Sequence, residues 1–473
     1  MKMRFALPFV AASVVLLLNG CMSVGPDYEQ PEMEMPDAWH QAVQKDLSTG
    51  TPDLQTWWTV FGDDTLNSLI TRASTNNLDL RTAAARIEQA AALRGVSASQ
   101  WFPDIVAGAG ASTVQSTLSQ TPSGSSRQGE LYQAGLSMAW ELDLWGRVRR
   151  SVESSDASLQ ATVEDYRDVL VVLYAEIAAN YINVRTIQER IKFAENNLKA
   201  QMETMELTQN RYDAGLVPAL DVSQSELNRS RTESIIPPLK QQLIGAINRL
   251  SVLTGNMPFA LQQQLEETKP IPAASDGVVL SLPAELLRQR PDIRRAERNL
   301  AAQNALIGAN QAELYPTLTL PGTLTVDSGN GDLFSSSNVG YSFGPQLRWN
   351  IFNGRRIRSQ VDAERAATKA ALLTYEQTIL LALEEVENAM AAYANEKDRI
   401  QSLESAEASA RKSVALVTEL YKSGLTDFQN VLNMEQALLN QQDDLATSHG
   451  LISANLVAIY KALGGGWNTT PAE

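Results

Sequence analysis

The sequence predicts a membrane protein of mixed α and β structure, built by internal duplication of one unit. Two strand-like segments end in related motifs, LDLWGR at 142–147 and WNIFNGR at 349–355. Each motif leads into a helical stretch that ends at a glycine turn, RYDAGL at 211–216 and LYKSGL at 420–425. The two stretches span 69 and 70 positions from glycine to glycine (146 to 215 and 354 to 424). Matching elements at matching spacing indicate an elongated repeat architecture rather than a compact enzyme.

Residues 1–20 have the pattern of a secretory signal, with basic residues before an apolar run too short to span a bilayer. The ending Leu18-Asn19-Gly20-Cys21 is similar to a bacterial lipobox, which predicts a lipidated N-terminus at Cys21. The alternative is an ordinary secretory signal followed by an unrelated cysteine. Met22 stands where an aspartate often retains lipoproteins in the inner membrane. We therefore expect a lipid-anchored protein in the outer membrane of a Gram-negative bacterium.

The composition argues against several classes of function. A formal net charge of −15 is unsuited to neutralising phosphates, so no nucleic-acid partner is expected. The single cysteine rules out an internal disulfide, and the two histidines stand far apart in the sequence without companions at ligand spacing. Phosphate-binding loops, nucleophile elbows and His/Cys clusters are not found in the sequence. We expect no cofactor, no metal site and no enzymatic activity.

The chain divides into an extended arm, two repeats, a linker and a tail. The expected ranges are 21–63 for the proline-punctuated arm, 64–255 for the first repeat, 256–291 for the linker, 292–463 for the second repeat and 464–473 for the tail. Each repeat begins with a helix and continues into two strands and two long helices. The strands are expected at about 104–114, 131–144, 317–327 and 339–351, and the long helices at about 147–214, 219–254, 355–423 and 428–463. Pro237-Pro238 predicts a break in the second long helix.

The expected strands alternate apolar and polar residues over lengths that suit a tilted membrane strand, which needs about 9–11 residues. Polar, turn-rich segments join them at 115–130 and 328–338. A soluble β-sandwich would show the same alternation, but four strands are few for a mature chain of this length. Four strands cannot close a barrel alone, and open sheet edges are not tolerated in lipid. Three chains would supply 12 strands, so we expect a homotrimeric 12-stranded transmembrane β-barrel.

The long helices are polar over most of their surface. The stretches 147–214 and 355–423 contain neither proline nor glycine, and at about 1.5 Å per residue each would reach roughly 100 Å. Helices that are polar nearly all round are stable when water lies on both sides and neighbouring helices supply the packing. A coiled coil is the alternative, but its heptads should be sharper. We expect a hollow helical barrel that continues the strand barrel.

Several stretches resemble the TolC-type outer-membrane factors, in the lipoprotein (NodT-like) branch of efflux-pump outer-membrane channels. They are CMSVGPDY at 21–28, Trp57-Trp58 with Phe61 and Asp63, and LPAELLRQRPDI at 282–293. The resemblance covers essentially the whole mature chain. It implies a homotrimer with a 12-stranded barrel in the outer-membrane lipid and a helical tunnel across the periplasm. It also implies docking to a periplasmic adaptor protein and to an inner-membrane pump, usually of the resistance-nodulation-division type.

The resemblance further implies a closable gate at the two helix turns. Alignment of Gly215 and Gly424 with the turn glycines of the family places Asp221 and Tyr421 on a hydrogen-bonded pair. A carboxylate that accepts a phenolic O–H makes a moderately strong bond that a partner can break. The alternative is that Asp221 complements the dipole at a helix N-terminus while Tyr421 packs.

The gate region departs from the family pattern. Thr426 stands where close relatives of TolC carry an arginine, and Asn430 and Asn433 stand where they carry aspartates that ring the constriction. Asparagine neither titrates nor attracts cations as a carboxylate does. We therefore expect a less acidic gate that is less sensitive to block by divalent cations, with Asp427 as a further candidate charge.

The turn tips are candidates for adaptor contact. Gly215-Leu216 and Gly424-Leu425 each place an apolar residue after the turn glycine. The alternative, compatible with the first, is a helix C-cap glycine with its accompanying hydrophobic contact.

The function expected is that of a passive outer-membrane exit duct for drugs, solvents or ions, energised by an inner-membrane partner. A second possibility within the same architecture is the exit duct of a type I protein secretion system. A possibility of a different class is a periplasmic structural lipoprotein that uses its long helices as a spacer.

Overall fold

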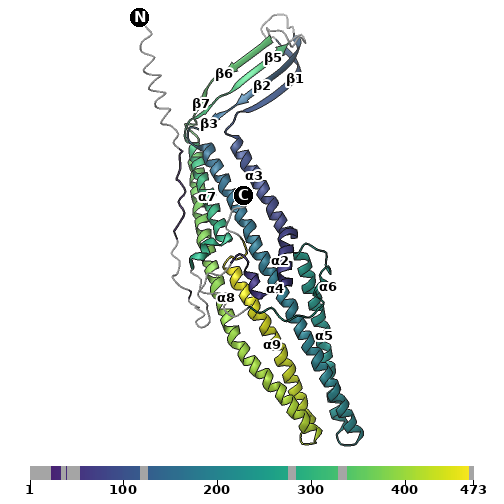
Figure 1. Cartoon of the computed structure of the whole chain (residues 1–473). Helices are drawn as coiled ribbons and strands as arrows, with labels where there is room; N and C mark the ends of the chain where they lie inside the picture. The colour runs from purple at the N-terminus through teal and green to yellow at the C-terminus, as the bar shows by residue number, and fades with distance from the viewer. Residues whose placement is uncertain are drawn as a thin grey trace, which may run out of the picture. The chain divides into compact units, whose positions relative to one another are not determined.

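The structure is a computed structural model that describes residues 23–32, 39, 54–117, 126–274, 284–328 and 338–467. Figure 1 shows long helices and a group of strands. The helices are η1 (Trp57–Phe61), α2 (Asp64–Asn76), α3 (Leu78–Ser99), α4 (Arg147–Asp213), α5 (Ala219–Leu253), α6 (Gln262–Leu265), η2 (Ala284–Gln289), α7 (Pro291–Ala312), α8 (Arg356–Lys422) and α9 (Phe428–Ala462). The strands are β1 (Asp104–Thr117), β2 (Ser126–Ala139), β3 (Glu141–Leu142), β4 (Thr317–Thr319), β5 (Gly322–Ser328), β6 (Val339–Phe343) and β7 (Gln346–Arg348).

The chain forms two compact units. The first comprises 1–32, 86–163 and 295–376, and the second comprises 33–85, 164–294 and 377–473. The first unit therefore contains all the strands, and the second contains both helix turns. Cys21 and the N-terminal signal lie outside the described residues. In the described part of the chain, no helix combines the length and the apolar character needed to cross a membrane.

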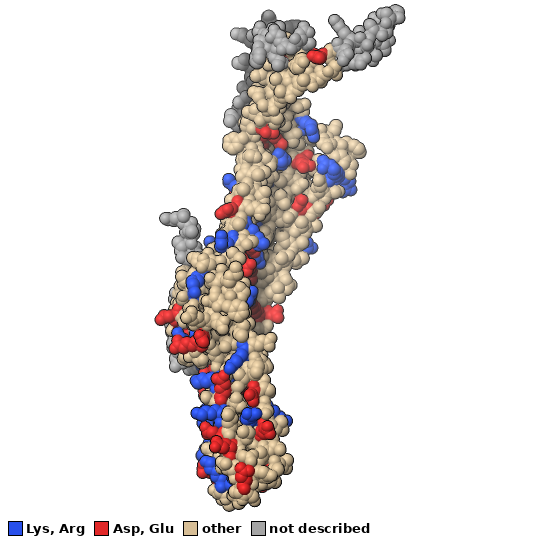
Figure 2. Space-filling model, turned by 90° about the vertical axis from the view of Figure 1, so that its right-hand side faces the viewer, with Lys and Arg blue, Asp and Glu red and all other residues tan. Residues whose placement is uncertain are grey.

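The strands of the first unit form two antiparallel sheets. One has the order β1-β2-β5-β6 and the other the order β3-β4-β7. Large apolar side chains are exposed along these strands, among them Ile105, Leu136, Leu324, Tyr341 and Phe343. Figure 2 shows few charged side chains over the strand region of this unit. An apolar surface of this kind suits contact with lipid.

Three of the expected strands are interrupted, which corrects the prediction: the ranges 131–144, 317–327 and 339–351 each include parts of two strands, β2 with β3, β4 with β5, and β6 with β7. The first two strands also extend into the loop expected at 115–130, since β1 runs to Thr117 and β2 begins at Ser126. The breaks occur at Trp140, at Leu320-Pro321 and at Gly344-Pro345, and the strand register places them side by side. A proline has no N–H for a sheet ladder, so Pro321 and Pro345 end the pairing on either side. The sheet is therefore divided along one line across three strands.

The N-terminal arm is held to α4 and α7 in the first unit. The N–H of Val24 donates to the carbonyl of Trp145 at 3.0 Å. Arg150 is buried, and its guanidinium donates to Val24 O at 3.3 Å and to the carboxylate of Asp27 at 2.6 Å. Further along, Tyr28 packs on a small cluster of alanines, Ala157, Ala301 and Ala302. The arm is therefore bound in place by specific contacts as far as Tyr28.

The second unit has its aromatic core beside η1. The ring of Trp57 stacks on that of Tyr460 with centroids 5.3 Å apart. Asp63 caps α2 by accepting from the N–H groups of Thr65 and Leu66, and it also accepts from the hydroxyl of Tyr181 at 2.7 Å. A carboxylate in this position satisfies backbone donors that the first helical turn leaves free.

Two helix predictions need correction. The helix expected from residue 64 to the first strand is divided at Asn77, whose side chain caps α3 through Leu80 N and donates to Leu253 O. The break expected at Pro237-Pro238 does not occur, and both prolines lie inside α5. Ile236 and Leu239 flank them and are buried. We attribute the continuity of α5 to this packing, which compensates for the hydrogen bonds that the prolines cannot make.

Candidate functional site

The two turns of the second unit have the same backbone geometry. Gly215 and Gly424 have φ of 70° and 73°. In the first turn the N–H of Gly215 donates to Tyr212 O at 2.8 Å, and that of Leu216 donates to Arg211 O at 2.9 Å. The second turn repeats this pattern, with Gly424 donating to Tyr421 O and Leu425 to Leu420 O, each at 2.9 Å. Both turns are Schellman caps, in which glycine adopts the left-handed conformation without steric cost.

The residues after the two glycines are the exposed tips. Leu216 is 66% exposed and Leu425 is 74% exposed. The structure therefore places the four proposed contact residues, Gly215, Leu216, Gly424 and Leu425, on accessible surface. The C-cap interpretation of the glycines holds at the same positions.

Tyr421 is the centre of a small hydrophobic cluster, which we call the turn cluster. It consists of the buried residues Val417, Tyr421, Phe428 and Val431, with Leu207 and Val217 among the side chains packed against it. The rings of Tyr421 and Phe428 lie 5.4 Å apart at an angle of 59°. Leu207 and Val217 come from α4 and the first turn, so the cluster joins the two turns.

Arg211 also connects the turns, and it was not among the residues predicted from the sequence. Its Nη1 donates to the carbonyls of Tyr421 and Lys422 at 2.8 and 2.7 Å. Its guanidinium lies 4.9 Å from the centre of the Tyr421 ring. A cation at the carbonyl end of a helix interacts favourably with the helix dipole. The sequence feature that could have pointed to Arg211 is the difference between the two turn motifs at this position, with Arg211 in the first and Leu420 in the second.

The structure brings Asp221 and Tyr421 close together, and each acts on the pKa of the other. Among the described residues the Tyr421 hydroxyl has no hydrogen bond of normal geometry, so the bond that the resemblance implies stays a prediction. Burial raises the pKa of Tyr421, and the nearby Thr208 and Asp221 also act on it. The pKa of Asp221 is raised by its partial burial and then by repulsion from Asp427, against the opposing effects of Tyr421 and Arg211. Asp221 is therefore drawn toward Arg211 and Tyr421 and repelled by Asp427.

The remaining predicted gate residues lie on α9 or at its start. Asp427 is the N-cap of α9, is exposed and makes no capping bond with its side chain. Asn430 donates to Thr426 Oγ1, and Asn433 accepts from Gln429, both at 2.9 Å. Both asparagines are exposed and bonded within their own segment. They are therefore not part of the contact between the two turns within one chain.

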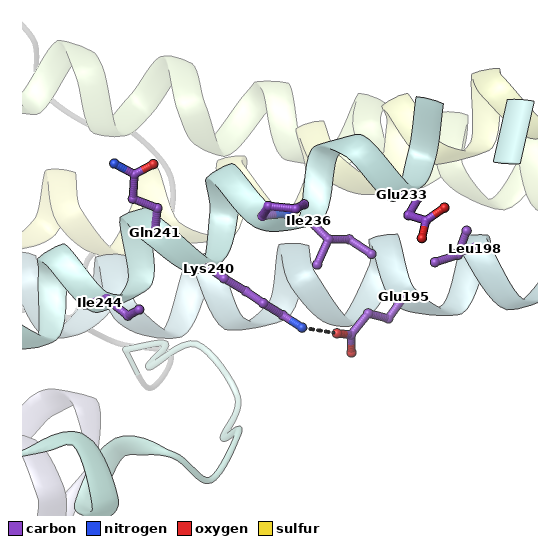
Figure 3. Close-up of a pocket in the computed structure, with 8 residues that line it drawn as sticks. Glu195, Leu198, Glu233, Ile236, Lys240, Gln241 and Ile244 are labelled. Atoms are coloured by element: carbon purple, nitrogen blue, oxygen red, sulfur yellow. Dashed lines mark ion pairs between the residues drawn. The ribbon is translucent and has the colours of Figure 1, made fainter. Parts of the chain in front are cut away.

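A groove of about 650 Å³ lies between α4 and α5. Figure 3 shows Lys240 of α5 reaching Glu195 of α4, and the Nζ to carboxylate distance is 3.0 Å. The other lining residues are Leu198, Glu233, Ile236, Pro237, Gln241 and Ile244. Figure 2 shows charges of both signs interspersed on this helical part of the unit. This lining carries no catalytic or metal-binding constellation, and no cluster of three or more potential metal-ligating side chains occurs within the described ranges.

Comparison with known proteins identifies the class of protein as an outer-membrane channel. The sequence matches the family described as "Outer membrane efflux protein" over residues 69–256 and 282–465, and the chain belongs to this family. It is 31% identical over 470 residues to "Nodulation protein T" of Rhizobium leguminosarum bv. trifolii, which covers 98% of both chains. It is 30% identical to the "Toluene efflux pump outer membrane protein TtgI" of Pseudomonas putida, over 99% of this chain and 100% of the relative.

Solved structures agree with the sequence relatives. The outer-membrane channel OprN superposes with a TM-score of 0.87 at 36% identity, covering 94% of this chain and 99% of that one. CusC superposes with a TM-score of 0.81 at 26% identity, covering 94% of this chain and all of that one. The fold class predicted from the sequence, that of a trimeric outer-membrane channel with a helical barrel, is confirmed. The protein is an outer-membrane efflux channel protein whose helical part lies in the periplasm.

Proposed function

We propose that this protein is the outer-membrane exit duct of a tripartite efflux system. Full-length similarity to an efflux-pump outer-membrane protein is the observation that carries the proposal. The duct would be passive and not an enzyme, and it would conduct drugs, solvents or ions delivered by an inner-membrane pump. Relatives named for toluene and cation efflux support small molecules or ions rather than a secreted protein as cargo.

The assembly proposed is a homotrimer anchored by a lipid on Cys21. Within the described residues, the four-stranded sheet has unpaired edges at β1 and β6. Lipid does not tolerate open sheet edges, so neighbouring copies would cover them. The exposed turns would meet a periplasmic adaptor protein, and the pump would be of the resistance-nodulation-division type. Mass spectrometry of the mature N-terminus tests the lipid: an unmodified Cys21 would contradict it.

The gate proposed is the contact between the two turns. Arg211 and the turn cluster hold the first turn against the second. Repulsion between Asp221 and Asp427 opposes this contact and leaves it breakable. An adaptor that binds the open turns modestly more tightly than the closed turns would then be enough to open the contact.

Single-channel conductance in planar bilayers tests both the duct and the gate. We expect a small conductance for the wild type and a larger one for Tyr421→Ala, because Tyr421 belongs to the turn cluster that holds the two turns together. Asp427→Asn should lower the conductance, because it removes the repulsion on Asp221. Tyr212→Ala is the matched control, since Tyr212 is the exposed counterpart of Tyr421 in the first turn.

Two results would contradict the proposal in different ways. Unchanged conductance in Tyr421→Ala would remove the gate assignment and leave the duct. The absence of any channel from trimeric, inserted protein would contradict the duct itself and favour a structural spacer.

A further inference from the structure

Glu435 is a buried carboxyl group in the helical part of the second unit. It lies on α9, between the second turn and the middle of that helix, and is 5% exposed within a single chain. Its counterpart in the first repeat, 209 positions earlier, is Glu226 on α5, which is exposed. Burial therefore distinguishes two glutamates that occupy equivalent positions in the duplicated sequence.

The Glu435 carboxylate joins three helices. One oxygen accepts from Thr204 Oγ1 of α4 and the other from Asn228 Nδ2 of α5, each at 2.8 Å. Both donors are uncharged. A buried carboxylate that has only neutral donors is less stable in its ionised form than one that faces a cation.

Charged side chains on the surrounding helices do not compensate Glu435. Among the described residues, burial, Thr204 and Asn228 are what act on its pKa. The neighbouring charged groups are exposed or paired elsewhere: Lys199, Glu203 and Glu206 on α4, Glu226, Arg229, Arg231 and Glu233 on α5, Glu407 and Arg411 on α8, and Asp427 at the start of α9.

The same layer of the helices contains further unused hydrogen-bonding groups. Gln201 on α4 is 2% exposed and Thr232 on α5 is fully buried. Within the described part of the chain, the side-chain amide of Gln201 makes no hydrogen bond through its nitrogen or its oxygen, and the hydroxyl of Thr232 makes none either. They lie about one helical turn from Thr204 and Asn228. Gln201 and Thr232 therefore leave polar groups unused in the layer that holds Glu435.

We propose that the protonation state of Glu435 sets how firmly α9 is held against α4 and α5, and thereby how readily the turn end opens. This inference rests on the channel function proposed above and adds a pH-dependent control to it. Glu435 acts as a positioning residue, since it does not touch the adaptor or the cargo.

The direction of the effect follows from the burial of Glu435. Burial raises its pKa, and the bonds from Thr204 and Asn228 only partly oppose that rise. A carboxyl group with a raised pKa stabilises the folded packing most at low pH, and this stabilisation is lost as the pH rises through the raised pKa. The three-helix contact should therefore be tighter in acid and looser toward neutral and alkaline pH.

Conductance recorded between about pH 5 and pH 8 tests the inference, with the trimeric protein and three sequences. The wild type should conduct at least about twofold more at the upper pH than at the lower. Glu435→Gln should conduct little at both, because the amide is neutral throughout: its oxygen can accept from Asn228 Nδ2 while its NH2 group donates to the hydroxyl of Thr204. Glu226→Gln, the exposed counterpart, should follow the wild type. A Glu435→Gln protein that retains the pH dependence of the wild type would overturn the inference.

Hydrogen exchange of residues 428–442 gives a second readout that does not need conduction. After correction for the intrinsic exchange rate, protection in the wild type should fall as the pH rises, and protection in Glu435→Gln should not. Equal pH dependence in the two proteins would overturn the inference. If the wild type formed no channels, the duct would be contradicted, while the exchange data would still decide the role of Glu435.

Discussion

The two helix turns share one backbone and differ in their side chains. Both are Schellman caps around a glycine of positive φ, with matching hydrogen bonds. Tyr212 of the first turn is 43% exposed, whereas its counterpart Tyr421 in the second is 2% exposed. Arg211 of the first turn binds the carbonyls of the second, and its counterpart Leu420 makes no equivalent link, being 45% exposed. Duplication has kept the turn, and the divergence of Arg211 from Leu420 has made one turn a donor and the other an acceptor.

Truncation of the buried tyrosine should have the largest effect. Tyr421→Ala removes the centre of the turn cluster and should lower the free energy of local unfolding by about 3 kcal/mol, as for other large core aromatics. Tyr212→Ala should change it by less than about 0.5 kcal/mol, as expected at an exposed position. Hydrogen exchange of the last turns of α4 and α8 measures both. Similar losses in the two variants would show that the turns are equivalent after all.

Removal of the arginine should have the next largest effect. Arg211→Met keeps most of the side-chain volume but deletes the charged donor to Tyr421 O and Lys422 O, for a loss of about 2 kcal/mol. The loss should appear in the last turn of α8, although the substitution is in α4. Leu420→Ala is the control at the equivalent position. Unchanged exchange in α8 after Arg211→Met would refute the link between the turns.

Substitution of the two turn glycines should give the smallest difference in lost stability between the turns. Gly215→Ala and Gly424→Ala each place a side chain in the left-handed region, at a cost of about 1 kcal/mol. A Cβ at Gly215 has open space, and one at Gly424 lies 3.7 Å from Arg211 Nη2, which is ordinary contact. Thermal stability measured on both variants should therefore fall equally. A much larger fall for Gly424→Ala would mean that the second turn is more tightly packed than its geometry indicates.

Local patterns in the sequence account for the elements. The proline-free and glycine-free stretches predicted the long helices within about two residues of α4 and α8. The turn glycines predicted where those helices end, since glycine adopts the left-handed conformation that stops a helix. Alternation predicted where the strands lie but misplaced several ends: β1 and β2 extend further into their connecting loop than predicted, and β3 and β7 end earlier. Pro321 and Pro345 were visible signals of the breaks, and alternation that continued across them concealed the interruption.

The sequence by itself determined the helix lengths and the glycine turns, because each depends on residues close together in the chain. Repetition of the same motifs indicated the duplication, and resemblance to a known family implied the class of channel. The tertiary structure decided which member of each duplicated pair is buried: Tyr421 rather than Tyr212, and Glu435 rather than Glu226. It also decided that Arg211 binds the end of α8, 210 positions away. Equivalent residues in two repeats have the same local sequence signal, and only the helices packed against them make one a contact and leave the other in solvent.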